Sequence, residues 1–171
     1  MIKKRHIILI LILALSLTAC DLIPPPPSAP PPANSTPTAE VVGETARVVR
    51  VIDGDTIDVD LDGQRYRVRY IGINTPERDE ACYQDATDAN VDWVAGQTVT
   101  LVKDVSETDP YDRLLRYVYV GDTFVNEALV RDGYAEAVQY PPDTSNADLF
   151  NRLEREARSA GRGCHPTGVF D

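Results

Sequence analysis

Two short segments of this 171-residue chain carry the residue types that hydrolysis of a phosphodiester needs. Arg69 and Glu77 stand at the two ends of the first segment, and Arg113 ends the second, which begins at Asp109. A guanidinium group can hold phosphoryl oxygens through its planar fork of N–H donors. A carboxylate is the usual general base where no histidine is near. We therefore predict Arg69 and Arg113 as catalytic phosphate-binding residues and Glu77 as the general base.

Oxygen donors surround the same segment. Asp55 offers a carboxylate, Asn74 an amide oxygen and Thr75 its backbone carbonyl. Such hard ligands suit Ca²⁺ better than a transition metal, and a divalent ion can act as a Lewis acid on a phosphoryl oxygen. We therefore predict these three residues as the ligands of a Ca²⁺ cofactor.

Each of these patterns, taken singly, also fits a simpler interpretation. An acidic turn such as 53–56 is common in solvated hairpins, and the alternating Arg65, Arg67 and Arg69 are typical of a charged strand face. It is the ordered combination of the patterns that favours a catalytic site.

The first residues of the chain are typical of an export signal. A basic start precedes an apolar run over 7–14, which is too short to span a bilayer, and small residues follow. Residues 17–20 resemble the bacterial lipobox, which implies cleavage before Cys20 and a diacylglycerol on its thiol. The alternative is an ordinary signal peptide with a chance cysteine. We expect 1–19 to be a signal peptide and the product to be an exported lipoprotein, anchored through Cys20 to a membrane of the cell envelope.

The segment that follows is rich in proline. Residues 20–43 cannot build a core and are expected to form a stiff polyproline tether. The folded domain is expected over 44–166, a length that suits one core, and 167–171 are expected to form a tail.

The chain is acidic, with a formal charge of −10, and removal of Lys3, Lys4 and Arg5 with a signal peptide would bring it to about −13. An acidic surface opposes non-specific binding to polyanions. The charge therefore argues against an architectural DNA binder. It leaves room for an enzyme that concentrates its few cations and a metal ion in one cleft.

The remaining cysteines form an even pair. With Cys20 assigned to lipid, Cys82 and Cys164 stand in an oxidising compartment, which favours a disulfide between them. Only His165 is available to join them, which disfavours zinc.

The pattern of apolar residues predicts a β-rich α+β fold. Turns at 53–54 and 62–63 make a meander of the first three strands. The predicted strands span 46–52, 56–61, 64–72, 98–102 and 114–120, and the predicted helices span 80–95, 125–131 and 147–160. Five strands with one helix after the third and helices at the end fit a five-stranded OB-fold barrel with about three helices.

From residue 47 to about residue 163, the chain resembles the thermonuclease (staphylococcal nuclease-like) family, and its envelope-lipoprotein members in particular. The matching pieces are 51–56, 69–77, 109–113 and 125–133. The resemblance implies an OB-fold barrel and an endonuclease-type hydrolase with Ca²⁺-dependent action on DNA and RNA. We expect a monomer and infer no protein partner.

By position, Arg69 and Arg113 match the two catalytic arginines of the family, and Glu77 matches its catalytic glutamate. Asp55 and Thr75 match calcium ligands.

Two tyrosines are expected to contact the substrate. Tyr111 matches a family residue that contacts a nucleotide phosphate, and Tyr140 stands near the base-stacking tyrosines.

Three positions depart from the family pattern. Asn74 stands where the best-known members have an aspartate, and the missing charge should weaken Ca²⁺ binding. Pro110 replaces a basic residue, which removes a phosphate contact. Asp112 replaces a glycine and is expected to place an anion beside Arg113 that partly neutralises it.

These departures and the acidic charge motivate an alternative function, a catalytically weak module of the same fold that binds nucleic acid or a partner. The retained Arg69, Glu77 and Arg113 favour the nuclease. An envelope lipoprotein with the barrel as a mere scaffold is a third possibility, which no feature of the sequence supports.

Overall fold

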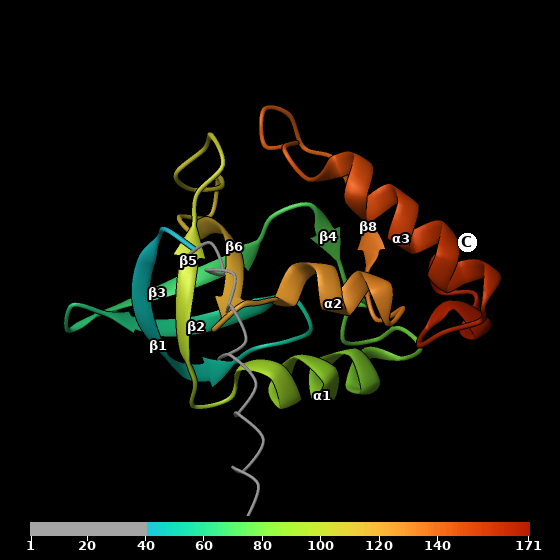
Figure 1. Cartoon of the computed structure of the whole chain (residues 1–171). Helices are drawn as coiled ribbons and strands as arrows, with labels where there is room; N and C mark the ends of the chain where they lie inside the picture. Colours follow the sequence, from blue (N-terminus) through green and yellow to red (C-terminus); the bar gives the residue numbers. More distant parts are fainter. Residues whose placement is uncertain (1–40) are drawn as a thin grey trace, which may run out of the picture. The chain divides into compact units, whose positions relative to one another are not determined.

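The first three strands form an antiparallel meander in the computed structural model, which describes residues 41–171 (Figure 1). They are β1 (Glu44–Val51), β2 (Thr56–Leu61) and β3 (Gln64–Tyr70). Asp62 and Gly63, with φ of 53° and 81°, form the two-residue turn between β2 and β3. The predicted signal peptide, the predicted lipidation site Cys20 and most of the proline-rich tether lie outside the described residues.

The predicted two-residue turn between β1 and β2 is wrong, because residues 52–55 form a longer loop. The Asp53 side chain accepts a hydrogen bond from the backbone N–H of Asp55 at 3.1 Å. This local bond folds the loop and turns Asp55 into the protein.

The barrel closes when β3 meets β6. β5 (Thr98–Val102) pairs with β1 and with β6 (Leu114–Val120), and β3 pairs with β6 in parallel, with Arg69 opposite Leu115. The sheet order β3-β2-β1-β5-β6 with this closure confirms the predicted five-stranded OB-fold barrel. A short strand, β7 (Thr123–Phe124), extends the sheet beyond β6.

Alternating apolar residues of the strands fill the barrel, and three helices complete the core. The fully buried members include Ile57, Val59, Val68, Val99 and Val118. The helices are α1 (Tyr83–Val94), α2 (Val125–Arg131) and α3 (Ala147–Ser159). α2 lies against β6 and packs on both α1 and α3 (Figure 1).

The predicted start of the first helix at residue 80 is wrong by three residues. Cys82 has a φ of 68°, a left-handed conformation that an α-helix cannot contain, so α1 begins at Tyr83.

Three strands of two residues each were missed by the sequence analysis, namely β7 and a pair that forms a separate sheet. β4 (Ile73–Asn74) pairs with β8 (Glu136–Ala137). The third strand was predicted to run to residue 72, but it ends at Tyr70, because Gly72 has a φ of 78° and turns the chain. A Cβ at Gly72 would lie 2.7 Å from the Phe150 ring, so the turn fits closely against α3.

The carboxyl-terminal residues return to the helical side of the molecule. The sulfur atoms of Cys82 and Cys164 are bonded, which ties the start of α1 to the segment after α3. A 3-10 helix, η1 (His165–Thr167), follows, and the Asp171 carboxylate accepts a bond from Arg158 at 2.6 Å. Within residues 41–171, none of the helices has the length and apolar character to cross a membrane.

Candidate active site

Arg69 lies at the end of β3, with its side chain only 13% exposed. Its Nη1 donates to the backbone carbonyls of Tyr70 and Ile73 at 2.7 and 2.8 Å. Its Nη2 donates to Asn74 Oδ1 at 3.2 Å, and its Nε lies 3.2 Å from Asp55 Oδ1. The guanidinium is therefore held in one orientation, as a phosphate-binding arginine requires.

Asp55 is buried beneath Arg69. One of its oxygens accepts bonds from the Thr75 N–H at 2.9 Å and the Thr75 hydroxyl at 3.1 Å, and the other accepts the Thr56 hydroxyl at 3.0 Å. A Cβ at Gly54 would lie 2.7 Å from Thr75, so only glycine permits this approach. Burial raises the pKa of the Asp55 carboxyl above its ordinary value, although the Arg69 guanidinium opposes the rise.

Asn74 is oriented by a residue that the sequence analysis did not single out. Its Nδ2 donates to Glu136 Oε1 at 3.1 Å, across the β4–β8 pair in which the two residues face each other. This bond fixes which end of the amide faces Arg69, so that Asn74 presents its oxygen there.

The three predicted calcium ligands lie together and offer only oxygen. Among residues 41–171, no three carboxylate, imidazole or thiol side chains converge, and Asp55 is the one charged residue of the three predicted ligands. A desolvated carboxylate with a raised pKa is a group that a cation stabilises, and all three donors are hard. The three residues therefore fit a calcium ion, and together they carry less negative charge than a site built from several carboxylates.

Glu77 follows this cluster by two residues, in an exposed loop. Its backbone N–H donates to Glu80 Oε2 at 2.7 Å. In the part of the chain that the structure describes, the Glu77 carboxylate makes no ion pair with either predicted arginine. It is open to solvent water, the molecule that a general base must deprotonate.

Arg113 is held by Asp109, four residues earlier. The Arg113 N–H and Nε donate to the two Asp109 oxygens at 3.0 and 2.6 Å, and Tyr111 donates its N–H to the same carboxylate. Burial alone would raise the pKa of Asp109, but these bonds hold it below its ordinary value. The sequence analysis left Asp109 without a role, although an acid four residues before a key arginine in a tight loop was a usable signal.

Asp112 adopts the left-handed conformation, with a φ of 61°. Aspartate is one of the few residues besides glycine that tolerates it, which explains how it replaces the glycine of the family pattern. Arg113 forms its ion pair with Asp109, and none joins it to Asp112 among residues 41–171, so partial neutralisation of Arg113 by Asp112 stays a prediction.

The two predicted substrate tyrosines lie apart. Tyr111 is 79% exposed, and its ring centre lies 5.5 Å from the Arg113 guanidinium carbon. Tyr140 is also exposed and forms an isolated bridge with Asp143. The structure therefore joins Tyr111, but not Tyr140, to a predicted catalytic residue.

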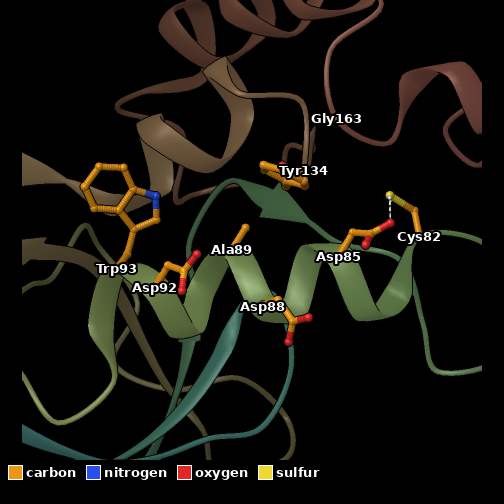
Figure 2. A pocket seen from close by; sticks show the side chains of 8 residues that line it. All are labelled: Cys82, Asp85, Asp88, Ala89, Asp92, Trp93, Tyr134 and Gly163. Carbon is orange, nitrogen blue, oxygen red and sulfur yellow. Dashed lines mark hydrogen bonds between the residues drawn. The ribbon is translucent and has the colours of Figure 1, made fainter.

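A cavity of about 430 Å³ lies along α1 and contains none of the predicted catalytic or metal-binding residues. Its lining includes Asp85, Asp88 and Asp92 on α1, with Trp93 and Tyr134 beside them (Figure 2). Three carboxylates in one cavity repel a polyanion, so this cavity is not the place for a phosphodiester.

A closed OB-fold barrel with a fixed Arg69 beside the buried Asp55, and with Arg113 held before β6, is the arrangement expected of a hydrolase of phosphodiesters. The model of the staphylococcal nuclease homologue family matches residues 67–164. The chain is 38% identical over 125 residues to the thermonuclease of Staphylococcus intermedius, covering 70% of this chain and 74% of that protein.

Two further relatives indicate the same family. The thermonuclease of Staphylococcus hyicus is 36% identical over 121 residues, which cover 67% of this chain and 72% of that protein. Endonuclease YncB of Bacillus subtilis (strain 168) is 40% identical over 118 residues, which cover 64% of this chain and 56% of that protein. The chain therefore belongs to the staphylococcal nuclease family.

Proposed function

We propose that this chain is an exported, lipid-anchored nuclease that hydrolyses phosphodiester bonds in DNA or RNA with Ca²⁺. The observation that carries the proposal is the cluster in which Arg69 contacts both Asp55 and Asn74. Barrel closure sets this cluster beside the strand that Arg113 precedes, because Arg69 pairs with Leu115.

The two arginines bind and orient the substrate phosphate. Carbonyl oxygens hold one side of the Arg69 guanidinium, and Asp109 holds Arg113, so that neither has to be ordered when the substrate arrives. Fixed donors that meet the charge developing on phosphoryl oxygens stabilise the transition state more than the ground state.

Glu77 acts as the general base toward the attacking water. The one histidine among residues 41–171 is His165 of η1, near the carboxyl terminus, so the exposed Glu77 carboxylate in the loop after Thr75 is the group proposed to take the proton.

Asp55, Asn74 and the backbone carbonyl of Thr75 would hold the calcium ion, and the ion would act as a Lewis acid that neutralises phosphoryl charge. The hydroxyls of Thr56 and Thr75 and the Thr75 N–H keep the Asp55 carboxylate in place.

The test is cleavage of single-stranded DNA by the purified full chain in Ca²⁺ and in excess EGTA. Glu77→Gln is expected to lower kcat by about 10²- to 10⁴-fold, because it removes the base. It should leave the free energy of unfolding within about 0.5 kcal/mol, since the side chain is exposed. Asp79→Asn, in the same exposed loop, is the matched control. Equal cleavage in EGTA or in Glu77→Gln would reject the mechanism.

The alternative is a binding module with little catalysis, which the single charge among the proposed ligands favours. If the chain binds oligonucleotide without cleaving it over a wide range of Ca²⁺ concentrations, this alternative replaces the nuclease.

The anchor is tested in cells. Cys20→Ser removes the thiol that lipidation needs, so the variant should move from the membrane fraction to the soluble envelope fraction. An unchanged distribution would reject the lipid anchor.

A further inference from the structure

A second cavity, of about 350 Å³, is lined by Arg113 and by none of the proposed metal ligands. Its lining comes from the β2–β3 hairpin and from the 109–113 loop. The lining residues are Asp58, Arg65, Tyr66, Arg67, Tyr111 and Arg113. The proposed function leaves Arg65, Tyr66 and Arg67 without a role.

The cavity is cationic in a chain whose formal charge is −10. Among residues 41–171, no carboxylate lies within ion-pair distance of Arg65, which is exposed. Arg67 pairs with Asp58 at 2.9 Å but remains 49% exposed, so Asp58 orients the guanidinium without covering it. With Arg113, which is paired with Asp109, the cavity is lined by three guanidinium groups and one carboxylate, and the unpaired Arg65 is free to attract phosphate.

Two tyrosines also line the cavity. The Tyr111 ring lies beside the Arg113 guanidinium, whereas Tyr66 alternates with Arg65 and Arg67 along β3 and points to the opposite face of the strand. Tyr66 is 40% exposed and Tyr111 is 79% exposed, although large aromatic side chains are usually covered. Exposed rings beside arginines form the stacking surfaces on which single-stranded nucleic acids bind, since every unpaired base has a π face. The cavity volume falls in the range of about 300–1,000 Å³ that is usual for small-ligand sites, so a nucleotide fits.

We propose that Arg65 and Arg67 form a subsite for a further nucleotide of a single-stranded substrate, next to the phosphate that Arg113 holds. Their two guanidinium groups, which share one face of β3, bind the phosphate of that nucleotide. The proposal rests on the proposed function, because it names the strand that the active site receives.

The effect of the subsite depends on substrate length. A strand of about ten nucleotides reaches the subsite, whereas a nitrophenyl ester of a thymidine phosphate ends at the active site. Arg65→Gln should raise KM for the oligonucleotide about tenfold and leave kinetics on the ester unchanged. Loss of one phosphate contact should also reduce the slope of log affinity against log salt by about 0.7.

The experiment compares both substrates for the full-length wild type, Arg65→Gln and Arg65→Lys. Arg65→Lys keeps the charge and should recover much of the oligonucleotide affinity. Arg155→Gln, at an exposed arginine of α3, is the control for loss of one charge. Equal KM for the oligonucleotide in Arg65→Gln and Arg155→Gln, or equal losses on both substrates, would overturn the subsite.

Failure of the proposed function gives a different result. If the wild type cleaves neither substrate, the nuclease proposal fails, and the subsite is then decided by the Kd for a fluorescent oligonucleotide. A Kd that rises in Arg65→Gln but not in Arg155→Gln supports the subsite, and equal values overturn it.

Discussion

Arg69 contacts two of the proposed calcium ligands, Asp55 through its Nε and Asn74 through its Nη2. A calcium ion held by those oxygens would neutralise them in place of the Arg69 guanidinium, which would then be free to bind the phosphate. At the scale of single residues, metal binding and phosphate binding are therefore linked through one side chain.

Asn74→Asp should tighten Ca²⁺ binding at a measurable cost. The new carboxylate adds charge to the ligand set, which raises affinity for Ca²⁺. It also faces Glu136 directly across the β4–β8 pair, and like charges in that position destabilise a sheet by about 0.2–1 kcal/mol. The variant should therefore be less stable than the wild type in EGTA and gain more from Ca²⁺, as measured by urea unfolding.

The double variant Asn74→Asp/Glu136→Gln is the matched control. It should keep the tighter Ca²⁺ dependence and lose the penalty in EGTA, because the glutamine amide can donate to the new carboxylate. If Ca²⁺ stabilises Asn74→Asp no more than the wild type, residue 74 is not a ligand.

The sequence named Arg69, Glu77 and Arg113 because the chemistry requires those residue types, but it did not reveal the residues that orient them. Glu136 reaches Asn74 through a strand of two residues, which is too short to leave a pattern. Asp109 was visible beside Arg113, yet only the fold of the loop shows that its carboxylate receives both N–H groups.

At the scale of elements, one buried arginine anchors the loop that presents Arg113. Arg116 is 2% exposed, and it pairs with Glu44 of β1 at 3.0 Å and with the Glu107 side chain. It also donates to the backbone carbonyls of Glu107 and Leu115 at 3.1 and 2.9 Å. The fork of this side chain therefore ties the 103–113 loop to two strands.

Arg116→Lys should disturb that loop while keeping its charge. An ammonium group cannot reproduce the planar set of bonds, so we expect a loss of about 1–3 kcal/mol of stability. KM for the oligonucleotide should rise more than kcat falls, because Tyr111 and Arg113 lie on the loop. Arg131→Lys, which alters an exposed pair with Asp132, is the control and should behave as the wild type. Wild-type stability and KM in Arg116→Lys would contradict this role.

Asp143 joins the 140–146 segment to the same loop. Its buried carboxylate accepts the N–H groups of Val105 and Ser106 at 2.9 and 2.7 Å. Burial raises its pKa, but the bonds from Ser106 and Val105 outweigh burial and lower the pKa below the ordinary value. The stability that this carboxylate supplies is therefore complete above its unfolded pKa of about 3.9 and is lost as the pH falls through the lower folded value.

Asp143→Asn should lower the free energy of unfolding by about 1–2 kcal/mol at neutral pH, because a charged acceptor becomes neutral. The difference from the wild type should shrink as the pH falls below about 4, and urea unfolding over that range measures it. Asp122→Asn, in an exposed turn, should show no such convergence. A difference that stays constant with pH would contradict the assignment.

The longer elements were predictable and the shorter ones were not. The strands that became β2, β5 and β6 were predicted with their observed bounds, since alternation over five or more residues is a strong signal. The late start of α1 follows from the left-handed Cys82, which is bonded to the distant Cys164. Long-range constraints of this kind leave no trace in local patterns.

At the scale of the whole molecule, acidic and basic side chains line different cavities. The cavity along α1 carries three aspartates, and the cavity at Arg113 carries three arginines against Asp58. Such a division repels a polyanion from one cavity and attracts it to the other, which guides how a strand approaches the protein.

The disulfide should supply a large part of the free energy of unfolding. Cys82 and Cys164 are separated by 82 residues, and a cross-link over that length restricts the unfolded chain by about 4 kcal/mol on entropic grounds. Reduction should therefore lower the urea midpoint of the wild type and leave Cys82→Ala/Cys164→Ala unaffected. Equal midpoints for oxidised and reduced wild type, or free thiols in protein taken from cells, would contradict the bond.

The parallel pairing of β3 with β6 has a consequence for when the protein becomes active. Residues 69 and 113 are distant in the chain, and they become neighbours only when these two strands join. The proposed mechanism, which uses both arginines, therefore predicts that a newly made or unfolded chain does not cleave nucleic acid. It also predicts that cleavage begins during refolding at the moment when the barrel closes.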